Sequence, residues 1–158
     1  MVDPLQFNDE QFSRLTRRAL SQMGNLPRLS ASPLTRMDLI ESRLAKRAGA
    51  DTTLERAAEL KKVLTESIAR LKPRDGNESG TTDAWRYYNA LYYPYVIGLK
   101  PYSLRVEYQE LDLPAKSTLS WFQSQVPERT LYNWQNAASK LVAQDIREQA
   151  DRNTQDQD

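Results

Sequence analysis

Residues 126–142 read VPERTLYNWQNAASKLV, and this stretch decides the fold class that the sequence predicts. After the opening Val-Pro pair, apolar residues recur at the three- and four-residue spacing of one helix face. We expect the helix to begin at Glu128 and to continue past Ile146. Its expected buried stripe is Leu131, Trp134, Ala138 and Leu141. The stretch therefore predicts a long helix that packs one side against a core.

The other side of this helix carries five polar or charged side chains. They are Arg129, Tyr132, Asn133, Asn136 and Lys140. A shorter helix is expected upstream, from about Ala115 to Gln125, with Leu119 and Phe122 as its apolar residues. Two helices joined by a turn of about three residues have the geometry of a helix-turn-helix.

The chemistry of the five polar side chains suits the grooves of double-stranded DNA. Arginine can bind guanine and asparagine can bind adenine, while tyrosine and lysine suit phosphates. Arg129 and Asn133 are the expected base readers, because recognition helices place their N-terminal residues against the bases. Tyr132 and Lys140 would hold phosphate, and Asn136 would do either. The alternative is an ordinary solvated helix face.

The composition of the chain argues against catalysis. Among 158 residues there is no Cys and no His, so thiolate chemistry, disulfides and the commonest general base are excluded. The sequence also shows no glycine-rich phosphate loop, no metal-ligand cluster and no pairing of a nucleophile with a base. We therefore expect a protein that is not an enzyme and that has no cofactor, no metal and no small-molecule substrate.

The charge is balanced overall but uneven along the chain. The 22 Lys and Arg residues against 21 Asp and Glu give a net charge of +1. Residues 1–74 hold 14 basic and 9 acidic side chains, whereas residues 144–158 hold 2 basic and 5 acidic side chains. The basic side chains of the first half are either solvated or add salt-sensitive affinity for a DNA backbone. They include Arg17, Arg18, Lys61 and Lys62.

The start of the chain and its hydropathy give no sign of a signal peptide or a membrane-spanning segment. The N-terminus MVDPLQFNDEQF lacks the basic start and apolar run of a signal peptide. No apolar stretch approaches the roughly 20 residues that span a bilayer. The expectation is a cytoplasmic protein without a membrane partner.

Three capped helices are expected in the first half. Asn8 with Gln11 has the pattern of a capping box, Ser32 precedes Pro33 at a second helix start, and Asp51 or Thr52 caps a third helix. Between the first two, NLPRLSA reads as a loop. The expected buried positions are Phe12, Leu15, Ala19, Leu20 and Met23 in the first helix; Leu34, Met37, Ile40 and Leu44 in the second; and Leu54, Ala57, Leu60, Leu64, Ile68 and Leu71 in the third.

The stretch KPRDGNESGTT has no apolar residue and two glycines, which is typical of a flexible linker. The expected organisation is a helical N-terminal region (residues 1–73), a linker (74–81), a helix-turn-helix domain (82–148) and a disordered acidic tail (149–158). The whole is expected to be all-α, with about six or seven helices.

The second half opens with a helix rich in aromatic residues. Its expected core positions are Trp85, Tyr88, Leu91 and Tyr92. Pro94 should kink or end this helix, and Gly98 should stop it. Tyr87 and Tyr93 fall off the stripe and stay open as base-stacking residues. The later stretch SLRVEYQEL fits a short strand or a helical turn about equally well.

Three short motifs resemble a known bacterial module. WRYYNALYYPYVIGL, VPERTLYNW and AASKLVAQ are similar to a helix-turn-helix that resembles region four of sigma factors and occurs ahead of signalling ATPase or repeat regions. The resemblance runs from about Ser32 to Val142 and implies a DNA-binding protein of transcription regulation. The chain departs from the pattern at Pro94, at Pro127 in place of a capping Ser, and in residues 102–114, which look like an acidic insertion.

Two classes of function therefore follow from the sequence. The first is a DNA-binding regulatory protein whose recognition helix spans about residues 128–146. The second is an adaptor, in which the same fold docks onto a larger protein, as the near-neutral, tyrosine-rich second half suggests. With few positive charges near the helix, useful DNA affinity would require a homodimer or a larger protein partner.

Overall fold

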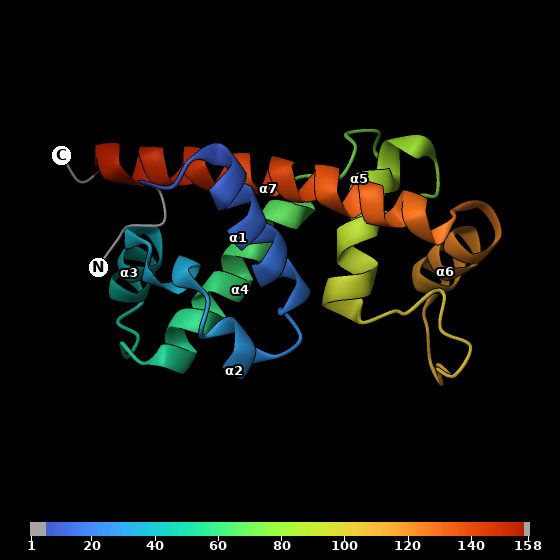
Figure 1. The fold of residues 1–158 in the computed structure, drawn as a ribbon, viewed down its shortest axis with the longest axis horizontal. Coiled ribbons are helices and arrows are strands. Elements are labelled where there is room, and N and C mark those ends of the chain that lie inside the picture. The colour runs from blue at the N-terminus through green and yellow to red at the C-terminus, as the bar shows by residue number, and fades with distance from the viewer. Residues whose placement is uncertain (1–5, 157–158) are drawn as a thin grey trace. The chain divides into compact units, whose positions relative to one another are not determined.

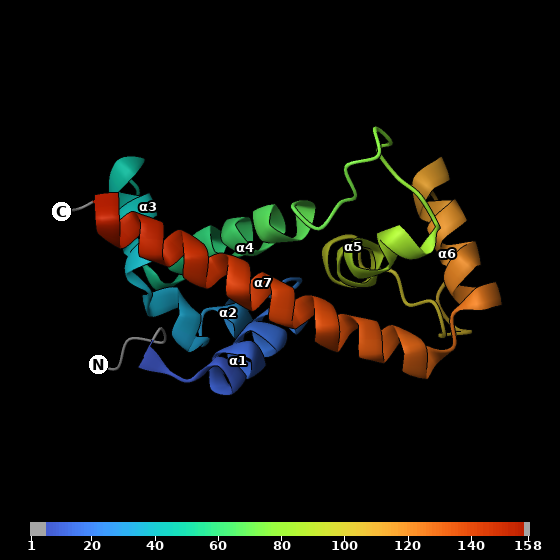
Figure 2. The ribbon, with the colours of Figure 1, turned by 90° about the horizontal axis from the view of Figure 1, so that it is seen from above.

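The computed structural model describes residues 6–156, and within them helices are the only regular secondary structure (Figures 1 and 2). The all-α prediction is confirmed. The described chain forms two compact units: a first unit of residues 6–67 and 139–156, and a second unit of residues 68–138. The expected boundaries at residues 74–81 and 148 differ from this division, because the long last helix contributes residues to both units.

The first unit contains five helical segments and the C-terminal part of a sixth (Figure 1). They are α1 (Asp9–Ser21), α2 (Leu26–Leu29), η2 (Pro33–Arg36), α3 (Asp38–Lys46), α4 (Thr53–Ala69) up to Ser67, and α7 (Glu128–Asp156) from Ser139 onward. The core of this unit holds side chains from each of them. Its largest members are Phe12, Leu20, Met23, Leu29, Leu34, Met37, Ile40, Leu60 and Leu64.

The predicted helix caps of the first unit are present. Asn8 and Gln11 form a reciprocal capping box, with the Gln11 N–H donating to Asn8 Oδ1 at 2.8 Å. Ser32 accepts from the Leu34 N–H at 3.2 Å. Of the two candidates for α4, Thr52 accepts from the Glu55 N–H at 3.1 Å. Local hydrogen bonding therefore places the helix starts where the sequence predicted them.

Two predictions for the first half are wrong. The expected loop NLPRLSA contains the short helix α2, which Asn25 caps by accepting from the Arg28 N–H. The expected helix after Ser32 is broken at Met37, whose ψ of 144° is extended. The break divides it into η2 and α3 while Leu34 and Met37 both remain fully buried. The simpler prediction was that one continuous helix buries both Leu34 and Met37. Packing in the core of the first unit breaks the helix instead.

Leu54 was expected in the buried stripe of α4, but it is 56% exposed. It lies in the first turn of that helix, directly after Thr53. The stripe is buried only from Ala57 onward, because the core begins one turn later. Leu15 and Leu71 are half-buried rather than buried.

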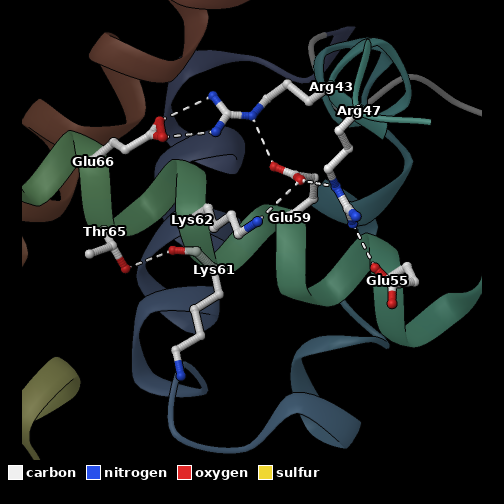
Figure 3. A network of polar contacts seen from close by, with 8 residues as sticks. All are labelled: Arg43, Arg47, Glu55, Glu59, Lys61, Lys62, Thr65 and Glu66. Atoms are coloured by element: carbon white, nitrogen blue, oxygen red, sulfur yellow. Dashed lines mark hydrogen bonds and ion pairs between the residues drawn. The ribbon is translucent and has the colours of Figure 1, made fainter. Parts of the chain in front are cut away.

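A network of ion pairs joins α3 to α4 in the first unit (Figure 3). Glu59 is 2% exposed and accepts from Arg43 Nε at 3.1 Å and from Arg47 Nε at 2.7 Å. The two arginines also reach outward to exposed acids, Arg43 to Glu66 and Arg47 to Glu55. A buried carboxylate is costly unless it is paired, and here two guanidinium groups supply the pairing.

The second unit is built from η3 (Asp83–Trp85), α5 (Arg86–Leu91), the π-helix η4 (Tyr92–Ile97), α6 (Leu113–Gln125) and the start of α7. Its core includes Trp85, Tyr88, Leu91 and Phe122, each at most 5% exposed. The expected core stripe of the aromatic helix is confirmed at Trp85, Tyr88 and Leu91, while Tyr92 is half-buried.

Pro94 distorts the aromatic helix as predicted. It has no N–H for the ordinary α-helical bond, and the chain there forms the wider π turn of η4. Gly98 follows with a left-handed φ of 91°, and its N–H donates to the Tyr93 carbonyl at 2.9 Å. The predicted helix stop at Gly98 is confirmed.

Residues 74–81 have no helix, but they pack within the second unit. Asp75 accepts from Trp85 Nε1 at 3.2 Å, and Asn89 Nδ2 donates to the Gly80 carbonyl at 2.8 Å. A Cβ on Gly80 would approach Trp85 Nε1 to 2.5 Å, so only glycine fits against this ring. Both ends of the segment belong to the second unit, and it is not the boundary between the two units.

The stretch SLRVEYQEL forms neither the suggested strand nor a helix, and residues 103–111 have an irregular path. Side-chain hydroxyls tie this region to its surroundings. Tyr108 accepts from the Lys100 N–H at 2.6 Å, and Tyr102 donates to the Val126 carbonyl at 2.7 Å.

The acidic tail, expected to be disordered from residue 149, is helical through Asp156. Ala150 is 3% exposed and continues the buried stripe of Ile146 one turn further. Asn153 Nδ2 donates to Ser42 Oγ at 3.2 Å. Contacts within the first unit therefore hold a segment whose composition alone suggested disorder. Residues 157 and 158 of the predicted tail lie outside the described residues.

Candidate nucleic-acid interface

The predicted helix-turn-helix corresponds to α6 and the first part of α7. Asp112 caps α6 by accepting from the Ala115 N–H at 2.9 Å, and a proline occupies the first turn. Helix α6 ends at Gln125, Val126 and Pro127 form the turn, and α7 begins at Glu128. Figures 1 and 2 show α6 running across the direction of α7 at this turn.

Buried and aromatic contacts hold α6 against α7 within the second unit. Phe122, Val126 and Leu131 are at most 5% exposed. The rings of Trp121 and Trp134 stack with their centroids 5.5 Å apart and their planes at 23°. The pair of helices therefore has a packed seam that sets the orientation of the first turns of α7.

Trp134 was expected in the buried stripe of the long helix, but it is half-buried and its aromatic partner is Trp121. Stacking covers one face of each indole, which leaves part of both rings accessible. Sequence reasoning missed Trp121 because it is next to Phe122, which occupies the inward position. The signal available in the sequence was the Trp of the shorter predicted helix, thirteen residues before Trp134.

Hydrogen bonding and burial also set the rotation of α7 about its axis. Gln135 is 9% exposed, and its Nε2 donates to the Ala90 carbonyl at 3.1 Å. Leu131 and Ala138 are buried beside it, as predicted. Leu141, also predicted to be buried, is 41% exposed, because the inward position one turn after Ala138 is taken by Val142.

Four of the five predicted contact residues lie in the second unit. Arg129, Tyr132 and Asn133 are exposed, Tyr132 to 55%, and Asn136 is half-buried. Lys140 is exposed too, but it belongs to the part of α7 that groups with the first unit. The structure therefore brings Arg129 and Asn133 together in the first turns of α7, and Lys140 does not belong to this group.

The electrostatics of the second unit are close to neutral. Residues 68–138 hold eight Lys and Arg and seven Asp and Glu. Near the candidate interface Arg129 follows Glu128, and the exposed cation of α6 is Lys116. Pro127 precedes α7 and has no hydroxyl to offer a phosphate or to cap the helix. Any contact with a polyanion here would rest on few charges.

The tyrosines of α5 and η4 are mostly internal. Tyr88 and Tyr93 are 5% and 4% exposed, and burial raises the pKa of both phenols, which keeps them neutral. Tyr93 is therefore not available as a base-stacking residue. Tyr87 is half-buried, and the Arg86 guanidinium lies over its ring at 4.3 Å. The stacking role that stayed open for Tyr87 and Tyr93 is wrong for Tyr93.

Within residues 6–156, no cluster of three or more acidic side chains is arranged to hold a metal ion. No helix of the described chain is long and apolar enough to cross a membrane. Comparison with family models, curated proteins and solved structures found no match for this chain.

Proposed function

We propose that the chain binds double-stranded DNA as a regulatory protein, with the first turns of α7 as the recognition element. The observation that carries this proposal is the exposure of Arg129 and Asn133 immediately after the turn from α6. In helix-turn-helix proteins the N-terminal residues of the second helix meet the base edges. Arginine and asparagine are the side chains that bind guanine and adenine through two hydrogen bonds.

The near-neutral charge of the second unit shapes the expected affinity. Few lysines and arginines can neutralise phosphates, so a single copy binds weakly and loses affinity as salt rises. A homodimer or a larger protein partner would supply the missing contacts. In this proposal Tyr132 and Asn136 support the orientation on the backbone, and Lys140 remains a separate, sequence-based prediction of a phosphate contact.

The test is fluorescence anisotropy with a labelled duplex of about 30 base pairs, at about 50 mM and about 200 mM salt. Wild type should bind at the lower salt, and Arg129→Ala or Asn133→Ala should each weaken binding by about 1–3 kcal/mol. Asn133→Ala should relax preference at one base position, whereas Lys140→Ala should weaken all sequences alike. Arg152→Ala, an exposed cation near the far end of α7, is the matched control.

Two outcomes would contradict DNA binding at this surface. One is wild type that fails to bind the duplex even at the lower salt. The other is an Arg129→Ala/Asn133→Ala double variant that binds as well as wild type while retaining its helical circular dichroism.

The second candidate is a protein-interaction adaptor, and exposed apolar side chains in the second unit favour it. Leu104 is 101% exposed, Leu113 is 76% exposed and Ile97 is 45% exposed. Exposed apolar side chains mark a protein-binding surface where they form a contiguous patch. Under this candidate, Leu104→Ser/Leu113→Ser would abolish capture of a protein partner, and the Arg129→Ala/Asn133→Ala variant would not.

A further inference from the structure

Two groups of arginines in the first unit differ in whether they form ion pairs. Arg43, Arg47, Arg56 and Arg147 each form an ion pair within the unit, at 2.6 to 3.1 Å. Arg14, Arg18 and Arg28 are exposed, and their guanidinium groups form no ion pair with any residue in the described range 6–156. The first group stabilises the fold, whereas the second group has charge available for a partner.

These three arginines line one surface depression beside α1. It consists of two adjoining cavities, of about 300 and 340 Å³, which share Leu15, Arg18 and Pro33 in their walls. Arg28 completes the first cavity and Arg14 the second. Arg18 lies four residues after Arg14 and three after Leu15, and these spacings place Arg18 beside both of them on one side of α1. We call this depression the α1 groove.

The α1 groove has an apolar floor and cationic sides. Leu15 and Phe7 are half-buried and Pro33 is exposed, so apolar surface is accessible along its length. No Asp or Glu is among the residues that line either cavity. The other polar side chains that line the two cavities are neutral, and they are Gln11, Gln22 and Ser32.

We propose that the α1 groove binds an acidic amphipathic segment of a partner protein. Carboxylates on that segment would pair with Arg14, Arg18 and Arg28, because arginine binds carboxylates through two parallel hydrogen bonds. Its apolar side chains would cover Leu15 and Pro33. Amphipathic helices bind apolar grooves in this way, with anchors spaced every three or four residues.

The apolar floor distinguishes a protein segment from a nucleic acid. Phosphate groups would satisfy the three arginines equally well, but a DNA backbone would leave Leu15, Phe7 and Pro33 without an apolar partner. A peptide with both acidic and apolar side chains matches both features of the groove. The groove lies wholly within the first unit, and its occupancy is independent of the DNA surface proposed for α7.

The test measures anisotropy of a fluorescein-labelled helical peptide of about 20 residues, with Leu at every third or fourth position and Glu beside each Leu. The full chain should bind it, and Arg14→Glu/Arg18→Glu should weaken binding by at least about tenfold. Leu15→Ser retains all charges and should weaken binding by about threefold or more, since it removes part of the floor. Helical circular dichroism and thermal unfolding establish that each variant is folded.

The control for charge is Lys61→Glu/Arg152→Glu, which makes the same change in net charge at exposed helix positions of the same unit. This variant should bind the peptide within about twofold of wild type. The proposal would be overturned if both double variants lost the same peptide affinity, or if wild type did not bind the peptide.

A second pair of probes separates a peptide site from a phosphate surface. A peptide with every Glu replaced by Gln should bind at least about tenfold more weakly than the acidic peptide. A short DNA duplex should not displace the acidic peptide. The duplex could displace the acidic peptide from wild type but not from Arg14→Glu/Arg18→Glu. That result would mean that the groove is a phosphate-binding surface, and the proposal would be wrong.

Discussion

At the scale of single residues, Glu59 shows how a buried charge is stabilised. Burial alone would raise the pKa of its carboxyl group, but hydrogen bonds from Arg43 and Arg47 together outweigh burial and lower that pKa below its ordinary value. The carboxylate therefore stays ionised at neutral pH inside the first unit. Both arginines also bind exposed acids, which holds their guanidinium planes in place (Figure 3).

Replacing this carboxylate should destabilise the first unit. Glu59→Gln keeps the size of the side chain but removes the charge that binds Arg43 and Arg47. We expect the free energy of unfolding to fall by about 1–3 kcal/mol at pH 7, the usual range for a hydrogen-bonded buried charge. Urea unfolding followed by circular dichroism measures it. Glu66→Gln, an exposed partner of the same Arg43, is the control and should cost less than about 1 kcal/mol.

The same variant has a predictable dependence on pH. Because the pKa of Glu59 is lowered in the folded state, its contribution is complete above the unfolded pKa of about 4.5 and is lost as pH falls through the folded pKa. The difference in stability between wild type and Glu59→Gln should therefore shrink below about pH 4.5. A difference that stays constant down to pH 3 would contradict the assigned ion pairs.

The residue scale also shows where prediction from the sequence is weakest. The inward and outward sides of α7 were predicted well at Leu131 and Ala138, but Leu141 and Trp134 were misplaced. A helix repeats every 3.6 residues, so a stripe assigned from integer spacings drifts after a few turns. Trp134 was misplaced for another reason, because its stacking partner Trp121 lies on a different helix.

At the scale of elements, the end of the aromatic helix depends on backbone geometry. Gly98 closes η4 in the left-handed region, with φ at 91°. Both the Gly98 and the Leu99 N–H donate to the Tyr93 carbonyl at 2.9 Å. Any residue with a Cβ is disfavoured at this φ, even though nothing lies within 4 Å of a Cβ built on Gly98.

Gly98→Ala should therefore lower the stability of the second unit by about 1–2 kcal/mol, through backbone strain rather than a clash. Thermal unfolding monitored by tryptophan fluorescence reports on this unit, since Trp85, Trp121 and Trp134 all lie in it. Gly24→Ala is the control, because Gly24 has open space around its Cα and no left-handed φ. It lies in the first unit, so its thermal unfolding is followed by circular dichroism. Equal effects of the two substitutions would show that the left-handed turn is not important.

Helix starts were easier to predict than helix continuity. The caps at Asn8, Ser32 and Thr52 are local, since each side chain binds an N–H two or three residues ahead. The break at Met37 has no such local signal. It places Met37 in the core between η2 and α3, and only the packing of the first unit requires it.

At the scale of the whole molecule, the end of α7 is a structural part of the first unit. Gln149 Nε2 donates to Asp145 at 2.8 Å, and Ser67 donates to the same carboxylate oxygen at 2.7 Å. The bond from Ser67 connects α7 to α4, and the bond between Asn153 and Ser42 connects it to α3. The two ends of the described chain thus meet in one unit, where Arg147 also binds Asp9 and the Phe7 carbonyl.

Removing residues 149–158 should destabilise the first unit by about 1–3 kcal/mol, since the truncation exposes the surface that Ala150 covers and leaves Ser42 without Asn153. Differential scanning calorimetry of the full and truncated chains measures the loss. Ala150→Gln should reproduce part of it by overpacking, and Glu148→Gln, exposed on the same helix, should not. Unchanged stability of the truncated chain would restore the expectation of a disordered tail.

The sequence by itself determined the all-α class, the helix caps that it predicted, the stop at Gly98 and the short turn between α6 and α7. These features depend on spacing and on hydrogen bonds between near neighbours, which a linear pattern records. Only the tertiary structure decided the two units, the break at Met37, the stack of Trp121 on Trp134 and the helical end of α7. Each of these depends on burial between residues far apart in the chain, whose energy no local pattern contains.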